Sequence, residues 1–166
     1  MVEKKFPAII MLNEKTGRMY ENAWALVAGY GMWVYGAVAL IGLLTARLTI
    51  VDAVVPVTFG YLIVMLAQTL IGKVRPKMPR SNSYRLWFNS GSCPSGHATL
   101  STILTVTQAR LIIWPDGWQL WATVLLGLVT VLIAVSRVKV GVHFVSDVLI
   151  GIGFGFILGI FWLGII

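Results

Sequence analysis

The chain has 166 residues, of which 58% are hydrophobic and only 11% are charged, and its mean hydropathy is +0.86. Soluble domains carry about 25% charged residues, so this composition argues against a soluble protein. The formal net charge of +7 would suggest a nucleic-acid partner in a soluble protein. In a membrane protein it favours anionic lipid headgroups instead, and we expect no nucleic-acid partner.

The first twenty residues combine a basic start with a short apolar run that contains Pro7 and leads into NEKTGR. No small-residue cleavage pattern follows, so we expect no cleavable targeting signal here. Residues 1–20 are predicted to be an amphipathic or loosely ordered segment at the membrane interface.

Five apolar stretches follow, each long enough, or nearly so, to cross about 30 Å of hydrocarbon. They cover residues 23–46, 50–72, 98–114, 118–136 and 143–166. The fold class is therefore predicted to be all-α, a polytopic transmembrane helix bundle with about five spans. The short connections leave no room for a second domain, so residues 1–166 are expected to form one domain with its bundle at 23–166.

The basic residues are divided unequally between the two sides of this predicted bundle. Eleven of the thirteen lie on the side that holds the N-terminus and the 73–97 and 137–142 loops, together with both histidines. Arg47 lies on the other side, and Arg110 can extend towards it. The positive-inside rule would make the histidine side cytoplasmic. Seven of the eleven cations, however, lie in loops that are candidates for anion binding, and such residues do not report on topology.

The first candidate element leaves the second span as GKVRPKMPRSN, residues 72–82, with four cations in eight positions. Lys73 and Arg80 are seven residues apart, although Pro76 and Pro79 argue against a regular helix. A basic flank that contacts lipid is the simpler reading of such a run.

The second element is CPSGH, residues 93–97, which is predicted to begin a helix on the same side of the membrane. Ser95 is expected to cap that helix, and Gly96 allows close approach of the backbone. The free N–H groups of the first turn would point towards a bound phosphate.

The third element is SRVKVGVHFVSD, residues 136–147. His143 and Asp147 are four apart, so on a helix they would share a face, and the carboxylate would accept the proton of one ring nitrogen. The other nitrogen would then be free as nucleophile or base. Arg137 adds a cation. A His–Asp pair that only holds the helix ends is the alternative for this element alone.

Together the three elements supply cations, helix-end donors, two histidines and a carboxylate, which is what phosphoryl transfer without a metal needs. Two histidines and an aspartate can also bind zinc, but the neighbouring cations would repel it, and no cysteine or glutamate completes the ligand set. We therefore expect no metal and no other cofactor.

The order and spacing of these residues resemble the type 2 phosphatidic acid phosphatase superfamily, the lipid phosphate phosphatases. The S-R-x5-H-x3-D motif is met at Ser136, Arg137, His143 and Asp147, and P-S-G-H at Pro94 to His97. The basic element resembles the K-x6-R-P motif less closely. Lys73 with Arg80 keeps both charges, but a serine follows where the family has proline. Arg75 has the following proline, but then Gln68 occupies the lysine position, so we favour Lys73 and Arg80 and keep Arg75 as a second candidate.

This resemblance implies that His143 is the nucleophile of a phosphohistidine mechanism and that Asp147 orients it. It also implies that His97 protonates the leaving oxygen and then activates water for the second step. It implies that phosphate is held by cations and by the N–H groups of the 95–97 turn: Lys73, Arg80 or Arg75, Arg137, Ser95 and Gly96. The residues alone do not decide which histidine attacks. The family usually has six spans, so the first one is missing from the five predicted here.

The implied function is hydrolysis of a phosphorylated membrane lipid by a multi-pass protein of the cell inner membrane, with the site on the extracytoplasmic face. Phosphatidylglycerophosphate, phosphatidic acid, polyprenyl pyrophosphate and lipid A 1-phosphate are equal candidates. A phosphotransferase between two lipids would use the same residues, and a non-catalytic membrane scaffold is the alternative of a different class. The related haloperoxidases are soluble. The sequence leaves the oligomeric state undetermined.

Overall fold

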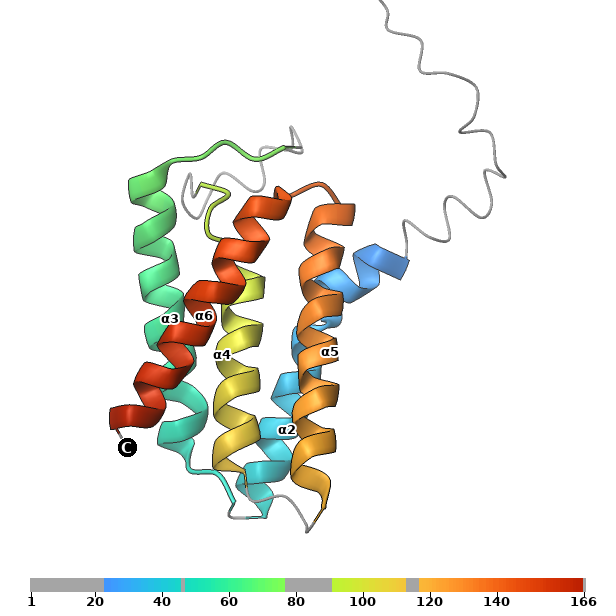
Figure 1. The fold of residues 1–166 in the computed structure, drawn as a ribbon, viewed down its shortest axis with the longest axis vertical. Helices are drawn as coiled ribbons and strands as arrows, with labels where there is room; N and C mark the ends of the chain where they lie inside the picture. Colours follow the sequence, from blue (N-terminus) through green and yellow to red (C-terminus); the bar gives the residue numbers. More distant parts are fainter. Residues whose placement is uncertain (1–22, 46, 77–90, 113–116, 166) are drawn as a thin grey trace, which may run out of the picture.

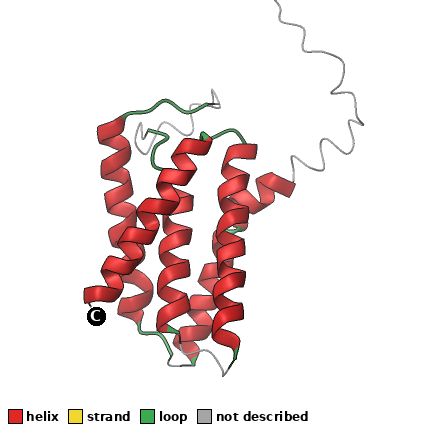
Figure 2. Cartoon of the chain, viewed as in Figure 1, coloured by secondary structure: helices red, strands yellow, loops and turns green. Residues whose placement is uncertain are grey.

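The computed structural model describes residues 23–45, 47–76, 91–112 and 117–165. Within these residues the regular structure is helical throughout, which confirms the predicted all-α class (Figure 2). The helices are α2 (Met32–Leu44), α3 (Ile50–Ile71), α4 (Gly96–Leu111), α5 (Trp118–Lys139) and α6 (Val145–Ile165). Residues 23–30 are also helical and precede α2. The predicted interfacial segment at 1–20 and Arg80 lie outside the described residues.

Four segments of the described chain are long and apolar enough to span a membrane: Ala23–Leu44, α3, α5 and α6. The predicted span at 98–114 corresponds to α4, which has 16 residues and a rise of about 24 Å. Its interior is rich in threonine and serine, and it is the most buried helix of the bundle. Threonine hydroxyls along it donate to the carbonyl one turn earlier, as Thr102 does to Ala98 at 2.7 Å, so burial leaves them satisfied.

The other helices surround α4 (Figure 1). The glycines Gly151, Gly155 and Gly159 of α6 face it closely enough that a Cβ on Gly155 would lie 2.4 Å from the carbonyl oxygen of Thr99. Only glycine permits such an approach, so this glycine face of α6 packs inside its own bundle.

A buried polar contact joins α2, α4 and α5 in the middle of the bundle. The hydroxyl of Tyr35 lies 2.8 Å from Thr105 Oγ1 and 2.6 Å from Thr130 Oγ1, and it donates to the carbonyl of Leu126 at 2.8 Å. Hydroxyls that bond one another avoid the penalty of unpaired polar groups in an apolar interior. The contact helps to fix the relative positions of the three helices, together with the bond that Gln108 Nε2 donates to the carbonyl of Tyr35 at 3.0 Å.

Two helix boundaries differ from the prediction in ways that affect the site. α5 continues to Lys139, so Arg137 lies in its last turn rather than in a loop. α6 begins at Val145, so His143 precedes the helix instead of lying on it. The predicted helical face shared by His143 and Asp147 is therefore wrong, because one of the two residues is outside the helix.

Candidate active site

The predicted site residues that the structure describes meet at one end of the bundle. The C-terminal ends of α3 and α5 and the N-terminal ends of α4 and α6 all lie at this end, which is the top in Figure 1. Three segments far apart in the sequence thus converge as predicted. They contribute Lys73, Arg75, Ser95, Gly96, His97, Arg137, His143 and Asp147.

A tight helix ending places His143 directly beyond α5. The N–H of Gly141 donates to the carbonyl of Val138 at 2.9 Å, and that of Val142 to the carbonyl of Arg137 at 3.2 Å. This pair of bonds is the Schellman arrangement, and Gly141 supplies the positive φ of 82° that it requires. The N–H of His143 also donates to the Arg137 carbonyl, at 3.3 Å. The spacing between Arg137 and His143 is therefore that of a helix end followed by one turn.

The imidazole of His143 is held by a main-chain oxygen. Its Nδ1 lies 2.7 Å from the carbonyl oxygen of Ser92. A carbonyl only accepts hydrogen bonds, so Nδ1 carries the proton and Nε2 keeps its lone pair. Nε2 faces the guanidinium of Arg75 at 3.5 Å. The ring is 3% exposed, and the nitrogen with the lone pair points at a cation that can hold an anion beside it.

Burial lowers the pKa of His143 to about 4, and the charge of Arg75 acts in the same direction. The contact with the Ser92 carbonyl opposes this shift only in part. At neutral pH the imidazole is therefore uncharged, which is the form that a nucleophile or a base needs.

The 91–95 segment is itself fixed by α3 and α6. Gln68 of α3 is 6% exposed, and its Nε2 donates to the carbonyl of Pro94 at 2.7 Å. The main-chain carbonyl of Gln68 accepts from the N–H of Gly91 at 3.3 Å. On the α6 side, the N–H of Ser95 donates to the main-chain carbonyl of Asp147 at 2.9 Å. Gln68 and Ser92 are absent from the predicted site. For Gln68 the available signal was a glutamine near the end of an apolar span. No signal in the sequence pointed to Ser92.

Asp147 has a different role from the predicted one. Its Oδ2 accepts the N–H of Phe144 at 2.9 Å, which caps the start of α6, and its Oδ1 lies 2.5 Å from Nζ of Lys73. The side chain is fully buried. The expectation that this carboxylate accepts the ring proton of His143 is wrong, because the Ser92 carbonyl holds that proton.

Lys73 leaves the end of α3 and lies over the start of α6. Besides Asp147, its Nζ donates to Ser146 Oγ at 3.0 Å and lies 4.8 Å from the ring centre of Phe144. The side chain is 36% exposed, so one side of the ammonium remains open to solvent or ligand. In this structure Lys73 therefore neutralises Asp147.

The second element begins α4 as predicted, with Ser95 at the N-cap position. Its side chain makes no cap bond, however, so the predicted capping by the hydroxyl is wrong. Instead, Ser95 Oγ is fully buried and has no hydrogen-bond partner among the residues that the structure describes. A Cβ on Gly96 would meet the nearest atoms at ordinary contact distance, so packing alone does not demand glycine there. His97 follows, within electrostatic reach of Arg137, His143 and Arg75.

Arg137 reaches from α5 towards the first helical segment, where its Nη1 donates to the carbonyl of Ala28 at 3.3 Å. Its Nε is buried and has no partner among the described residues. The site thus contains two buried donors, the hydroxyl of Ser95 and the Nε of Arg137, that a bound oxyanion would satisfy.

Comparisons with known proteins agree with this arrangement. The sequence profile of the PAP2 superfamily matches residues 49–166. The chain belongs to the PAP2 superfamily. Among solved structures, this PAP2 protein is similar to the crystal structure of the first transmembrane PAP2 type phosphatidylglycerolphosphate phosphatase from Bacillus subtilis. The two share 20% identity with a TM-score of 0.55, over 93% of this chain and 88% of that one. No curated protein matches the chain.

The similarity to the Bacillus subtilis structure establishes the fold, and the apolar helices make this PAP2 member a membrane protein. The family match covers all three motifs, at residues 72–82, 93–97 and 136–147. Among the described residues, Arg75 lies 3.5 Å from Nε2 of His143, and it is followed by proline as the family motif expects.

Proposed function

We propose that this PAP2 protein is a lipid phosphatase that forms a phosphohistidine on His143. The observation that carries the proposal is the arrangement of His143. Its protonated Nδ1 is held by the Ser92 carbonyl, and its free Nε2 faces Arg75. Two buried donors that have no partner in the described part of the chain, Ser95 Oγ and Arg137 Nε, lie at the same end of the bundle.

In the first step Nε2 of His143 attacks phosphorus, and the bond between phosphorus and the lipid oxygen breaks. His97 donates a proton to that oxygen as it leaves, and then accepts one from the water that hydrolyses the phosphohistidine. Acid and base help of this kind contributes about 10²–10⁴ in rate. Burial and the charge of Arg137 lower the pKa of His97 to about 4. The negative charge of a bound phosphoryl group acts in the opposite direction and favours the protonated form before the first step.

Cations and buried donors stabilise the charge that develops on the phosphoryl oxygens. Arg75 and Arg137 take this role together with Ser95 Oγ and the N–H groups at Gly96. Lys73 contributes from the open side of its ammonium, and Arg80 remains a proposed phosphate ligand outside the described residues. Because side chains supply the positive charge, we expect activity to persist in EDTA. Loss of turnover in EDTA with recovery on adding zinc or magnesium would contradict this account.

The substrate is proposed to be a phosphorylated lipid whose headgroup reaches this end of the bundle from the cell inner membrane, on its extracytoplasmic face. The protein from Bacillus subtilis is described as a phosphatidylglycerolphosphate phosphatase, so phosphatidylglycerophosphate is the first substrate to test. Phosphatidic acid, polyprenyl pyrophosphate and lipid A 1-phosphate present the same phosphoryl group and complete the panel.

The test is phosphate release by the purified protein from each of these four lipids, with EDTA present. His143→Ala should abolish release, and Lys139→Ala, which changes an exposed cation at the same end of the bundle, should not. Phosphate that appears on a second lipid instead of in solution would indicate a phosphotransferase. Turnover of none of the four lipids by the folded wild type would favour a scaffold.

The roles of the two histidines can be distinguished by how the activity of each variant depends on the leaving group. A lipid alkoxide needs a proton to leave, whereas an aryl oxide leaves without one, so His97→Ala should recover part of its rate on an aryl phosphate. His143→Ala should not recover on either substrate. Acid-labile phosphate should be trapped on His143, and its detection on His97 would reverse the two roles.

A further inference from the structure

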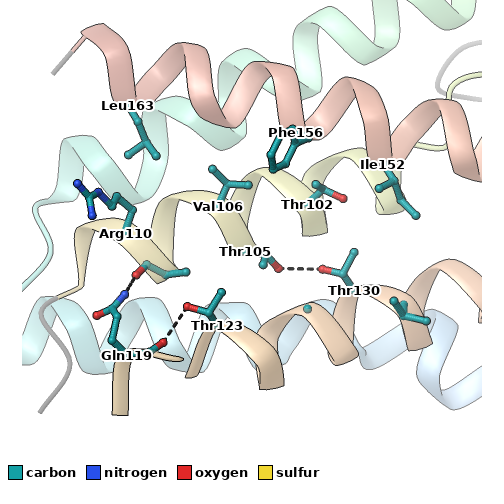
Figure 3. A pocket seen from close by; sticks show the side chains of 13 residues that line it. Thr102, Thr105, Val106, Arg110, Gln119, Thr123, Thr130, Ile152, Phe156 and Leu163 are labelled. Carbon is teal, nitrogen blue, oxygen red and sulfur yellow. Dashed lines mark hydrogen bonds between the residues drawn. The ribbon is translucent and has the colours of Figure 1, made fainter. Parts of the chain in front are cut away.

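A groove of about 570 Å³ runs along α4 between α5 and α6. It extends from Thr102 and Ile152 to Arg110 and Leu163, which lie at opposite ends of the view in Figure 3. The two flanking helices pack mainly on α4 and little on each other. The groove is therefore a gap between two membrane-spanning helices that α4 closes at the back.

The threonine hydroxyls that line the groove are already hydrogen-bonded within the protein and need no partner from a ligand. The hydroxyl of Thr102 donates to the Ala98 carbonyl at 2.7 Å, and that of Thr123 to the Gln119 carbonyl at 2.8 Å. The hydroxyls of Thr105 and Thr130 bond each other at 2.8 Å. Satisfied threonines present their methyl groups, and the remaining wall is largely aliphatic and aromatic. A hydrocarbon chain is the ligand that such a wall suits.

A small apolar cluster separates the groove from the candidate active site. Ala98 of α4, Ala134 of α5 and Val148 of α6 are buried against one another, with Val138 and Ile152 packed beside them. They lie between the groove and the residues around His143. None of the groove-lining residues belongs to that site. The chain of a substrate whose phosphate is at the active site therefore has no direct route into the groove.

Arg110 lies at the other end of the groove and is the one charged residue among the described residues that line it. This arginine is exposed and lies in the last turn of α4, about 20 Å along the helix axis from His97. Within the described chain, the ion pair is the distant one between Lys73 and Asp147. A cation at the mouth of an apolar groove at a membrane surface is complementary to a lipid phosphate.

We propose that this groove binds one acyl chain of an anionic phospholipid from the leaflet opposite the candidate active site, with the lipid phosphate against Arg110. The chain fills the space between α5 and α6, which carry Arg137 and Asp147 respectively. Bound lipid therefore stabilises the bundle and holds together the two helices that deliver these residues to the other end. The site is distinct from the proposed catalytic one and does not depend on it.

Native mass spectrometry of the detergent-purified protein tests this site with dioleoyl phosphatidylglycerol and the phosphatidylcholine of the same chains. Wild type should retain one phosphatidylglycerol and show a higher Tm with it than with phosphatidylcholine. Arg110→Gln should weaken retention about tenfold or more. Gly127→Leu should do the same by filling the groove, since a Cβ at Gly127 meets no atom within 4 Å.

Gly153→Leu is the matched control, because Gly153 is equally open but lies on α6 outside the groove. It should retain the lipid, as should Arg75→Ala. Equal retention of phosphatidylcholine, or undiminished binding in Arg110→Gln, would overturn the assignment of an anionic headgroup. Loss in Arg75→Ala with retention in Arg110→Gln would place the lipid in the candidate active site and overturn the proposal. Failure of catalysis without loss of lipid would count only against the proposed function.

Discussion

The carbonyl oxygen of Ser92 lies 2.7 Å from Nδ1 of His143 and so determines which ring nitrogen is free to react. A main-chain carbonyl does not titrate and carries no net charge. It therefore orients the ring at every pH without the strong rise in imidazole pKa that a bonded carboxylate would cause. The Ser92 carbonyl thus fixes the tautomer, whereas burial and the charge of Arg75 lower the pKa of His143.

The first prediction concerns the protonation of His143, whose pKa burial and the charge of Arg75 lower to about 4. The unfolded value is about 6.5, so the folded state prefers the neutral ring. Its contribution to stability is fully present above pH 6.5 and is lost as pH falls towards 4. NMR of protein labelled with ¹⁵N-histidine should show a neutral ring with protonated Nδ1 at pH 5.

The chain has only two histidines, so His97→Gln suffices to assign the spectrum. A proton on Nε2 in the neutral form would show that the Ser92 carbonyl does not hold the ring. A midpoint near 6.5 for His143 would show that burial and Arg75 do not lower its pKa.

The second prediction concerns Gln68, which holds the Pro94 carbonyl two residues beyond Ser92. Gln68→Leu keeps the approximate volume and removes the donor, so the 91–95 segment should shift. Small displacements of catalytic groups cost up to about a hundredfold in rate. We expect kcat to fall about tenfold to a hundredfold with little change in KM, and the His143 ¹⁵N signals to broaden or move. Thr69→Ala, on the exposed face of the same helix, is the control. Unchanged kcat in Gln68→Leu would remove its positioning role.

The sequence predicted the helices and their meeting point well because both follow from chain length and apolarity. A helix of given direction has its ends on known sides of the membrane, so the segments at 73, 95 and 143 had to meet. Gly141 was also visible in the sequence, but its role in ending α5 could be recognised only once the last residue of α5 was known. Three more helical residues turned Arg137 from a loop residue into a helical one.

The hydrogen-bond partners of the site residues could not be predicted from the sequence, for a different reason. The spacing of His143 and Asp147 suggests a bond between them only if both lie on one helix, and the helix begins at Val145. The true partner of the ring is the main-chain oxygen of Ser92, which every residue type possesses. Contacts of this kind leave no trace in side-chain identity.

The third prediction distinguishes the two candidates for the first-motif arginine. The sequence favours Arg80, whereas the structure places Arg75 against His143 at 3.5 Å. Arg75→Ala should therefore lower kcat/KM about a hundredfold or more, since it removes a cation from the position where charge develops. Arg75→Lys should recover only part of this loss because a lysine lacks the planar fork. An inactive Arg80→Ala beside a largely active Arg75→Ala would restore the pairing of Lys73 with Arg80.

The fourth prediction concerns the ion pair of Lys73 with the buried Asp147. Lys73→Met leaves that carboxylate without its cation and should destabilise the fold by about 2 kcal/mol, less than for a fully buried pair because Lys73 is 36% exposed. Adding Asp147→Asn should recover part of the loss, since the amide oxygen still accepts from Phe144. Denaturation in detergent of all four members of the cycle measures this coupling.

In the same cycle, Asp147→Asn alone should leave the proton of the His143 ring on Nδ1. Transfer of that proton to Nε2 in this variant would show that Asp147 orients the ring after all.

The last prediction uses two glycines of α6 that differ only in what faces them. A Cβ at Gly155 would lie 2.4 Å from the carbonyl oxygen of Thr99 and 2.8 Å from Cβ of Thr102, whereas a Cβ at Gly153 would meet nothing within 4 Å. Gly155→Ala must push α6 away from α4 and should destabilise the fold by about 1–3 kcal/mol. Gly153→Ala should be neutral or stabilising by up to about 1 kcal/mol, as expected from helix propensity. Thermal unfolding in detergent compares the two variants with wild type.

Because α6 carries Asp147 and α4 carries His97, Gly155→Ala should also lower activity while Gly153→Ala preserves it. Equal Tm values for the two variants would show that the close approach of α6 to α4 is not what holds this end of the bundle together.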